Sequence, residues 1–505
     1  RFRHGCAGAR RLKARGGRPM PPVAAGGLAP VGERPAMELP PLGAHAARSL
    51  RRVVLVHRHG VRLPTKPTPP LEASLPHDPA FWSASAGHLT PRGASQLRRL
   101  GAEMRRRYDE AWRLHPGLVG SAHVAAYSSL VQRAMHSAWA FLEGFVPEAP
   151  VFTGSLTDAD GLAGRAARAG AVPLFLEGTA PQEARLFHGW WETAVEYREW
   201  LRANQGRSAR LRALSEDGKC MALLDKLHAL THEPKVSPRL PALKRLLGAR
   251  RLDTLALIGE VHGMPTFASA PGASPDAEVS GGLTAEERHL LARISHEAKR
   301  CWFNDSGVGE ELPSAERSYG WRAAGHLVRF ISRLLDPAIG DLQVASADKL
   351  VAVPRGAYQL ADDRGDAMAS PDLTAASTAS AAPRFFELSC HDRTLAALAA
   401  VLGVDLPAYG FASHFVFECH EIEGGGGPGN GDGPLVRLYY NSDPFRGSTL
   451  GECRIPPLSR SRWIVAWEDL PQGGFPLAEF AAHCQHERAP PMLPPPAGGP
   501  PRARL

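Results

Sequence analysis

The stretch VVLVHRHGVRLP, residues 53–64, runs from four aliphatic residues directly into two histidines and two arginines. An uninterrupted apolar run is typical of a strand buried in a parallel sheet, and open α/β sheets bind ligands at the carboxyl ends of their strands. Because arginine keeps its charge and offers a planar fork of donors, the polar cluster suits an anion, above all a phosphate group. The stretch therefore predicts an anion site at the end of a buried strand.

The segments that follow this strand alternate between helical and strand patterns. In LTPRGASQLRRLGAEMRRRY, Thr90 is placed as an N-cap and Pro91 as the first helical residue. The strand pattern HVAAYSSL and the helical pattern QRAMHSAWAFLEGF, which ends near Gly144, come next. Such alternation predicts an α/β fold with a mixed, mostly parallel sheet flanked by helices.

A change of pattern predicts a second domain. Residues 179–309 show helical patterns without strong strand runs, including the possible capping box of Thr284 and Glu287. We expect a helical cap domain here, inserted in an α/β domain that is made of residues 50–178 and 310–485. The α/β domain resumes with the strand FFELS and continues with the strands HFVFECHEI and LVRLYYN.

Both ends of the chain have a composition unlike the rest. Residues 1–49 are predicted to be a disordered basic leader rich in Gly, Pro, Ala and Arg, and residues 486–505 a proline-rich tail.

The net charge of +8 favours acidic partners, but the sequence has no recognition motif and predicts no specific nucleic-acid site. We expect no membrane span and no secretory signal, and hence a soluble protein of the cytoplasm or an organelle. Nothing in the sequence indicates an oligomeric state.

The seven cysteines form neither a C-x-x-C pair nor a dense disulfide framework. One alternative is a zinc site built from Cys390, His391, Cys419, His420 and Cys484, but this set matches no known zinc-ligand spacing. The sequence therefore predicts no metal site.

A second polar motif, His391-Asp392, follows the strand FFELS. A phosphoryl-transfer site needs a nucleophile, cationic donors around the phosphate oxygens and an acid for the leaving group. His59 supplies a nucleophile, Arg58 and Arg62 supply the donors, and Asp392 supplies the acid. Because adjacent strands can come from distant parts of a chain, the separation of the two motifs is no obstacle.

Together the two motifs resemble the histidine acid phosphatase family, in the branch whose signature is R-H-G-x-R-x-P with a later H-D. Residues 58–64 read RHGVRLP and residues 391–392 read HD, and the similarity extends over roughly residues 50–485. The resemblance implies the histidine phosphatase fold and an acid phosphatase that hydrolyses phosphomonoesters through a phosphohistidine. It implies that the enzyme needs neither a metal nor an organic cofactor. The partner that it implies is a phosphorylated small molecule, the substrate.

The resemblance also implies a role for each motif residue. His59 would be the nucleophile, and Asp392 would protonate the leaving alkoxide and then help to activate water. The phosphate oxygens would be held by Arg58, Arg62, Arg133 and His391. This chain has Gln132 where the family usually has an aspartate before the third arginine.

The residues that bear on substrate choice are Thr65, Lys66 and Arg393. Thr65 and Lys66 follow the proline as in the phytase-like members, and Lys66 and Arg393 exceed what one phosphate needs. We therefore expect a preference for multiply phosphorylated substrates such as inositol phosphates. In the alternative interpretation, Arg393 points away along its helix and pairs with an acidic neighbour. The alternative function is that of a catalytically inactive relative that binds phosphorylated ligands. His57 lies outside the signature and is expected to be a hydrogen-bonded structural residue.

Overall fold

The structure is a computed structural model. It describes residues 49–65, 85–114, 123–156, 159–177, 186–187, 195–262, 267, 282–303, 319–336, 343–346, 349–352, 384–402, 404, 406, 409–421, 433–441 and 475–485. The predicted proline-rich tail, all of the predicted basic leader except Ser49, and Lys66 lie outside these ranges.

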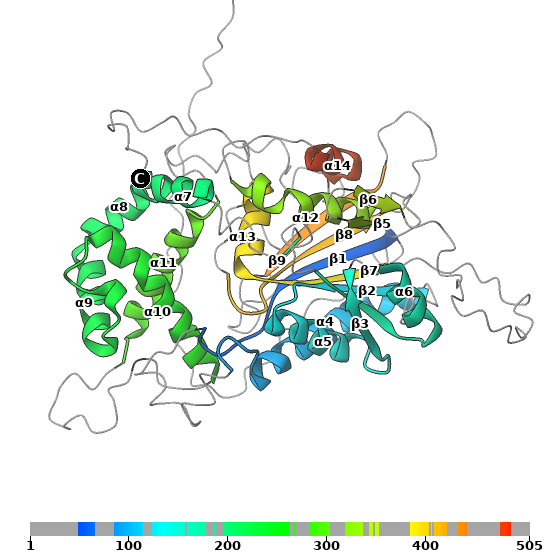
Figure 1. Cartoon of the computed structure of the whole chain (residues 1–505), viewed down its shortest axis with the longest axis horizontal. Helices are drawn as coiled ribbons and strands as arrows, with labels where there is room; N and C mark the ends of the chain where they lie inside the picture. Colours follow the sequence, from blue (N-terminus) through cyan, green and yellow to red (C-terminus); the bar gives the residue numbers. More distant parts are fainter. Residues whose placement is uncertain are drawn as a thin grey trace, which may run out of the picture. The chain divides into compact units, whose positions relative to one another are not determined.

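One mixed sheet of eight strands, in the order β10-β9-β8-β1-β7-β2-β4-β3, forms the centre of the described structure (Figure 1). The central strand β1 (Leu50–Arg58) has the parallel neighbour β7 (Phe385–Cys390) and the antiparallel neighbour β8 (His414–His420). The remaining strands are β2 (Val124–Ser128), β3 (Val151–Ser155), β4 (Val172–Leu176), β9 (Leu435–Asn441) and β10 (Phe475–Pro476). Since β1, β7, β2, β4 and β3 are mutually parallel, the predicted fold class is confirmed.

Helices cover the sheet, and most of the described elements between β4 and β7 are helices. They are α4 (Pro91–Leu114), α5 (Gln132–Phe145), α6 (Ala159–Arg168), α7 (Val195–Arg207), α8 (Ala209–Glu216), α9 (Gly218–Thr231), α10 (Ala242–His262), α11 (Ala285–Arg300), α12 (Gly320–Leu335), α13 (Asp392–Val401) and α14 (Leu477–Gln485). A 3-10 helix, Pro234–Val236, and a two-stranded sheet of β5 (Gln343–Ser346) and β6 (Lys349–Ala352) complete the described elements. None of the described helices combines the length and apolar character needed to cross a membrane.

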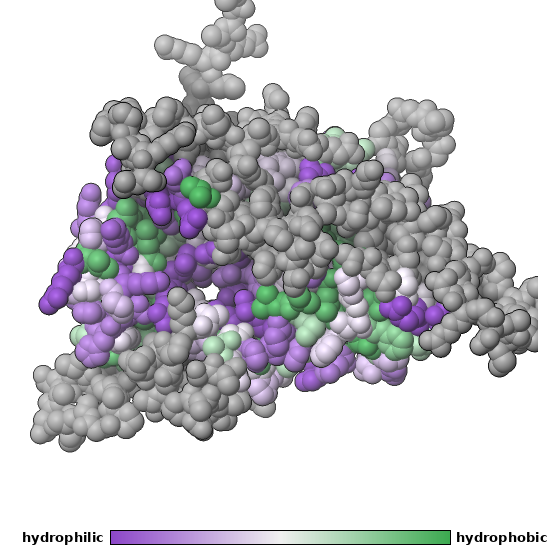
Figure 2. All heavy atoms as spheres, viewed as in Figure 1, coloured by the Kyte–Doolittle hydropathy of each residue, from purple (hydrophilic) through white to green (hydrophobic). Residues whose placement is uncertain are grey.

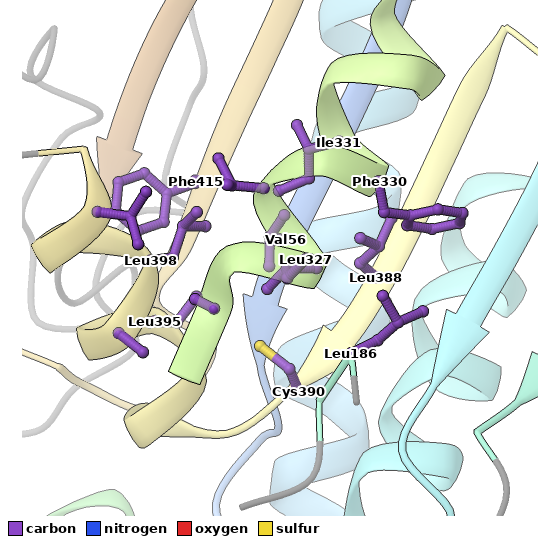
Figure 3. Close-up of a cluster of buried hydrophobic side chains, with 14 of the residues drawn as sticks. Val56, Leu186, Leu327, Phe330, Ile331, Leu388, Cys390, Leu395, Leu398 and Phe415 are labelled. Atoms are coloured by element: carbon purple, nitrogen blue, oxygen red, sulfur yellow. The ribbon is translucent and has the colours of Figure 1, made fainter. Parts of the chain in front are cut away.

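Strand β1 is apolar on both faces because helices cover both faces of the sheet. Val56 packs with Leu327 of α12 and Leu395 of α13 in one core cluster (Figure 3). Leu55 points to the other face and packs in a second cluster with Phe141 of α5. Successive side chains of a strand point to opposite faces, so two covered faces require a continuous apolar run. This arrangement explains why the sequence reads VVLV before the polar cluster.

The described residues between β4 and α12 form helices joined by turns, and none of them lies in a strand. Helices α8 to α11 share a third hydrophobic cluster, and hydrophilic residues cover much of their described surface (Figure 2). The predicted capping box is confirmed, since the Thr284 hydroxyl accepts from Glu287 N at 3.1 Å and the Glu287 carboxylate accepts from Thr284 N at 2.8 Å. The predicted helical character of this stretch is therefore observed in its described residues.

The loop after β1 lies directly against the first turn of α4. The Thr90 hydroxyl accepts from Gly93 N and donates to Val61 O, each at 3.1 Å, which confirms the predicted cap and joins it to the loop. A Cβ atom on Gly60 would lie 2.3 Å from Gly93 O, and one on Gly93 would lie 2.1 Å from Val61 O. The loop can approach the helix this closely only because both positions lack a side chain.

We expect Gly60→Ala to lower the free energy of unfolding by about 1–3 kcal/mol or more, because the added methyl group would overlap backbone atoms. Chemical denaturation would measure the loss. A matched control is Gly164→Ala inside α6, where a Cβ would meet nothing within 4 Å. There the change should raise stability by up to about 1 kcal/mol through helix propensity. Equal effects of the two substitutions would show that the contact between the loop and α4 is not tight.

Candidate active site

The two sequence motifs meet because β1 and β7 are parallel neighbours. Arg58, at the end of β1, is in register with Cys390, at the end of β7. The next residues, His59 and His391, therefore lie side by side, with their ring centroids 5.5 Å apart. The neighbouring strand β2 adds Ser129, whose hydroxyl is 3.0 Å from His391 Nε2. Three parallel strands thus bring their carboxyl ends to one site.

The imidazole of His59 is buried and held in one orientation. Its Nδ1 lies 2.8 Å from the carbonyl oxygen of Gly60, and a carbonyl can only accept, so Nδ1 carries the proton. Nε2 accepts a hydrogen bond of 3.1 Å from Arg133 Nε. Burial, followed by the charges of Arg133 and Arg58, lowers the pKa of His59 well below its usual range. The ring is therefore neutral and presents the Nε2 lone pair, which is the form that a nucleophile needs.

Arg58 and Arg62 are fixed by contacts that leave part of each guanidinium for a ligand. Arg58 donates through Nη1 to the carbonyl oxygen of Tyr409, and its guanidinium lies 4.2 Å from the ring centroid of Phe411. Arg62 donates through Nη1 to Leu63 O at 2.8 Å. The Nε atoms of both arginines are buried and have no hydrogen-bond partner within the described part of the chain. Buried donors of this kind indicate a site for an acceptor-rich ligand.

The three guanidinium groups lie close enough to disfavour one another's charge. Burial, then Arg133 and Arg58, lowers the pKa of Arg62 to about 9. The pKa of Arg133 is lowered first by burial, with a further contribution from Arg58. Bringing cations together out of water costs free energy unless an anion joins them. The electrostatics therefore favour binding of an anion at this point.

Asp392 is the first residue of α13, and its carboxylate lies among these cations. Its Oδ2 is 3.6 Å from Arg58 Nη2, and its Oδ1 accepts from Arg393 N at 3.0 Å. Burial alone would raise the pKa of Asp392, but Arg58, Lys299, Arg393 and Arg62 outweigh it and hold the pKa well below the ordinary range. In the protein without substrate this carboxyl group is therefore ionised.

Of the three residues proposed for substrate choice, the structure describes Thr65 and Arg393. Thr65 is exposed, and a Cβ atom on Gly87 would be 3.1 Å from Thr65 Cγ2 and 3.7 Å from Arg133 Nη1. Thr65 is thus at the edge of the arginine group. The guanidinium of Arg393 lies 5.0 Å from the ring centroid of Trp302, in the turn after α11. Lys66 lies outside the described residues.

Gln132, the departure from the family pattern, has a defined structural position. Its Oε1 accepts from Leu89 N at 3.0 Å, and its Nε2 is 2.9 Å from His136 Nδ1. Gln132 therefore joins the first turn of α5, which carries Arg133, to the loop before α4. In the sequence, the only indication that Gln132 lies near the site was its position next to Arg133.

His57 is buried behind the site and has two hydrogen bonds. Its Nδ1 is 3.1 Å from Arg58 O, its Nε2 contacts the Glu387 carboxylate, and its ring stacks on Phe141. Burial raises the pKa of Glu387, which His57 partly opposes. These contacts agree with the structural assignment of His57 made from the sequence.

The alternative zinc site does not form in the described part of the chain. Cys390, Cys419 and Cys484 are buried free thiols, and no group of three or more His, Cys, Asp or Glu residues described here could hold a metal ion.

Part of the chain is similar in sequence to proteins of known family. Residues 49–165 match the family model of the histidine phosphatase superfamily (branch 2). Phytase AppA of Escherichia coli (strain K12) is 33% identical over 103 residues, which are 20% of this chain and 24% of the relative. Lysosomal acid phosphatase of Rattus norvegicus is 36% identical over 118 residues, 23% of this chain and 25% of the relative.

A solved structure of Hafnia alvei phytase in complex with tartrate aligns with 88% of this chain and 98% of its own, with 18% identity and a TM-score of 0.49. The matches to the two curated relatives span about a quarter of their length, 24% and 25%. The family match contains β1, the loop after it and Arg133 of α5. Over residues 49–165 the chain is therefore similar to branch 2 of the histidine phosphatase superfamily, the family that its first motif resembles.

Proposed function

We propose that this protein is a phosphoric monoester hydrolase of the histidine acid phosphatase type. The observation that carries the proposal is the neutral, buried His59, whose Nε2 faces Arg133 beside two further arginines and Asp392. A nucleophile, a cationic site for phosphate and an acid within one site are the components that phosphoryl transfer needs.

In the proposed reaction, the phosphate of the ester binds to Arg58, Arg62, Arg133 and His391. The bound phosphate replaces the hydrogen bond between Arg133 and His59 Nε2, so that Nε2 can attack phosphorus. The bond from phosphorus to the ester oxygen breaks as the bond to Nε2 forms, and Asp392 delivers a proton to the departing oxygen. Water, deprotonated by Asp392, then attacks the phosphohistidine and releases phosphate and free His59.

We further propose that the enzyme favours multiply phosphorylated substrates, such as inositol phosphates. Thr65 at the edge of the arginine group, together with Lys66 and Arg393, would contact the parts of the substrate beyond the phosphate being transferred. In this proposal the helices α7 to α11 belong to a cap domain of residues 179–309, and the α/β domain consists of residues 50–178 and 310–485.

Release of inorganic phosphate from an aryl phosphate by the purified full chain tests the proposed function directly. Steady turnover without added metal is the expected result. Binding of phosphate esters without turnover would instead support the alternative, a catalytically inactive member of the family.

We expect kcat/KM to fall as the pH rises above about 6, the second pKa of a phosphate monoester. His59 remains neutral in acid because its pKa is lowered, so the nucleophile is not lost there. Asp392 is ionised before substrate binds because the surrounding cations lower its pKa, so the proton for the leaving group enters with the monoanionic ester.

Profiles of kcat/KM against pH for esters with different second pKa values would measure this effect. The alkaline midpoint should move with the second pKa of the substrate. One common midpoint for all esters would mean that a group of the enzyme, and not the substrate, brings the proton.

A further inference from the structure

A second group of cations lies beside Asp392 on elements other than those that carry the phosphate arginines. The guanidinium of Arg250, on α10, is 4.8 Å from the ring centroid of Trp302, the same indole that Arg393 contacts at 5.0 Å. Trp302 N donates to Lys299 O at 2.9 Å, so Lys299 lies in the turn that leads to this indole. Two cationic side chains, from α10 and α13, therefore lie against the Trp302 indole, and Lys299 of α11 lies in the turn before it; Figure 1 shows these three helices.

Helix α11 also contacts the loop that holds the phosphate site. The ring of His296 stacks on Tyr409 with a centroid distance of 6.4 Å. The carbonyl oxygen of Tyr409 in turn accepts a hydrogen bond from Arg58. The end of α11 is thus joined to the site at two points, through Tyr409 and through the contact of Trp302 with Arg393.

Lys299 is buried at 7% relative exposure, which is unusual for a lysine. Its Nζ is 3.7 Å from Asp253 Oδ2, whereas Arg288 makes the closer contact to that carboxylate, at 2.7 Å. Burial, and then the charges of Arg58 and Arg250, lower the pKa of Lys299, while Asp253 and Asp392 oppose this. A buried ammonium group close to guanidinium groups is costly, and an added anion would offset the cost.

We propose that Arg250 and Arg393, which lie against Trp302, and the buried Lys299 in the turn before it form a second anion subsite that receives a carboxylate or phosphate group on the leaving alcohol. This inference rests on the proposed function, in which Asp392 protonates the leaving oxygen. The alcohol must then lie on the Asp392 side of the transferred phosphate. Arg393 is the next residue after Asp392, and the charge of Lys299 acts on the Asp392 carboxylate, so an anion on that alcohol meets this group of cations.

A matched pair of substrates tests the subsite. Glycerol 3-phosphate and 3-phosphoglycerate differ only in a hydroxymethyl group and a carboxylate, and propane-1,3-diol bisphosphate tests a phosphate in the same role. We expect the wild-type full chain to favour both anionic substrates by kcat/KM. Lys299→Met should lower each ratio to glycerol 3-phosphate roughly tenfold, the effect of one charge-assisted contact. Arg250→Gln, at a half-buried position, should act in the same direction if Lys299→Met does not fold.

Lys219→Met is the matched control, because the Lys219 side chain is 79% exposed on α9 and should leave the ratios unchanged. Ratios that stay at the wild-type value in both Lys299→Met and Arg250→Gln would overturn the subsite while leaving the proposed phosphatase intact. An effect on the bisphosphate alone would restrict the subsite to phosphate. A wild-type chain that hydrolyses none of these esters would overturn the proposed function and the subsite with it.

Discussion

Replacing His59 by alanine is expected to lower kcat for an aryl phosphate by about 10⁴-fold or more, the loss typical of removing a covalent nucleophile. The Nδ1 contact with Gly60 and the lowered pKa of His59 leave its Nε2 unprotonated and able to attack phosphorus. Arg58, Arg62 and Arg133 remain in the variant. Inhibition by inorganic phosphate should therefore persist, and initial rates with and without phosphate measure both effects.

The matched control for this substitution is His289→Ala, an exposed histidine on α11 that should leave kcat unchanged. A His59→Ala protein that keeps activity within about tenfold of the wild type would remove His59 from the reaction. Loss of activity together with loss of phosphate inhibition would instead point to a collapsed site, which thermal unfolding of the variant would reveal.

The second large effect is expected for Asp392→Asn. Asparagine keeps the size of the side chain but cannot transfer a proton, so kcat/KM for an alkyl phosphate should fall about 10²- to 10⁴-fold. For 4-nitrophenyl phosphate the loss should be much smaller, because nitrophenolate leaves without protonation. The measurement is the ratio of the two losses in one preparation.

Asp217→Asn is a suitable control, since Asp217 caps α9 through Lys219 N at 2.8 Å and asparagine caps equally well. This substitution should leave kcat/KM unchanged for both the alkyl phosphate and 4-nitrophenyl phosphate. Equal losses on the alkyl and aryl esters in Asp392→Asn would contradict the general-acid role and leave Asp392 as a residue that only organises the arginines.

The sequence was most informative where each element carries its own local signal. Thr90 and Pro91 mark the start of α4, Thr284 and Glu287 mark the start of α11, and the apolar run of β1 reflects coverage on both faces. The pairing of the two motifs followed from their positions at strand ends, which the parallel register of β1 and β7 brings together.

Strands β3 and β4 were not predicted, and β4 contains Pro173. Proline is disfavoured inside central strands because it has no N–H to donate. Here Pro173 is paired with Phe152 of β3, and the pairing of β4 with β2 begins only at Leu174. A proline at the beginning of a strand is compatible with such a sheet, but the sequence alone does not reveal that position.

Two residues of the site environment had no sequence signal. Ser129 contacts His391 only because β2 is the parallel neighbour of β7, which is a property of the strand order. Lys299 follows a helical pattern in which a lysine is ordinarily solvated, and only tertiary packing buries it and lets its charge act on the Asp392 carboxylate. Contacts that depend on tertiary packing of distant segments cannot be derived from local patterns.

The central claim, covalent phosphoryl transfer to His59, is tested most directly by trapping the intermediate. The wild-type chain would be mixed with a ³²P-labelled aryl phosphate, denatured in base within the first turnover, and mapped by peptide mass spectrometry. The account predicts an acid-labile, base-stable phosphoryl group on the peptide that contains His59, absent from His59→Ala. A phosphoserine, or turnover with no phosphoprotein under these conditions, would contradict it.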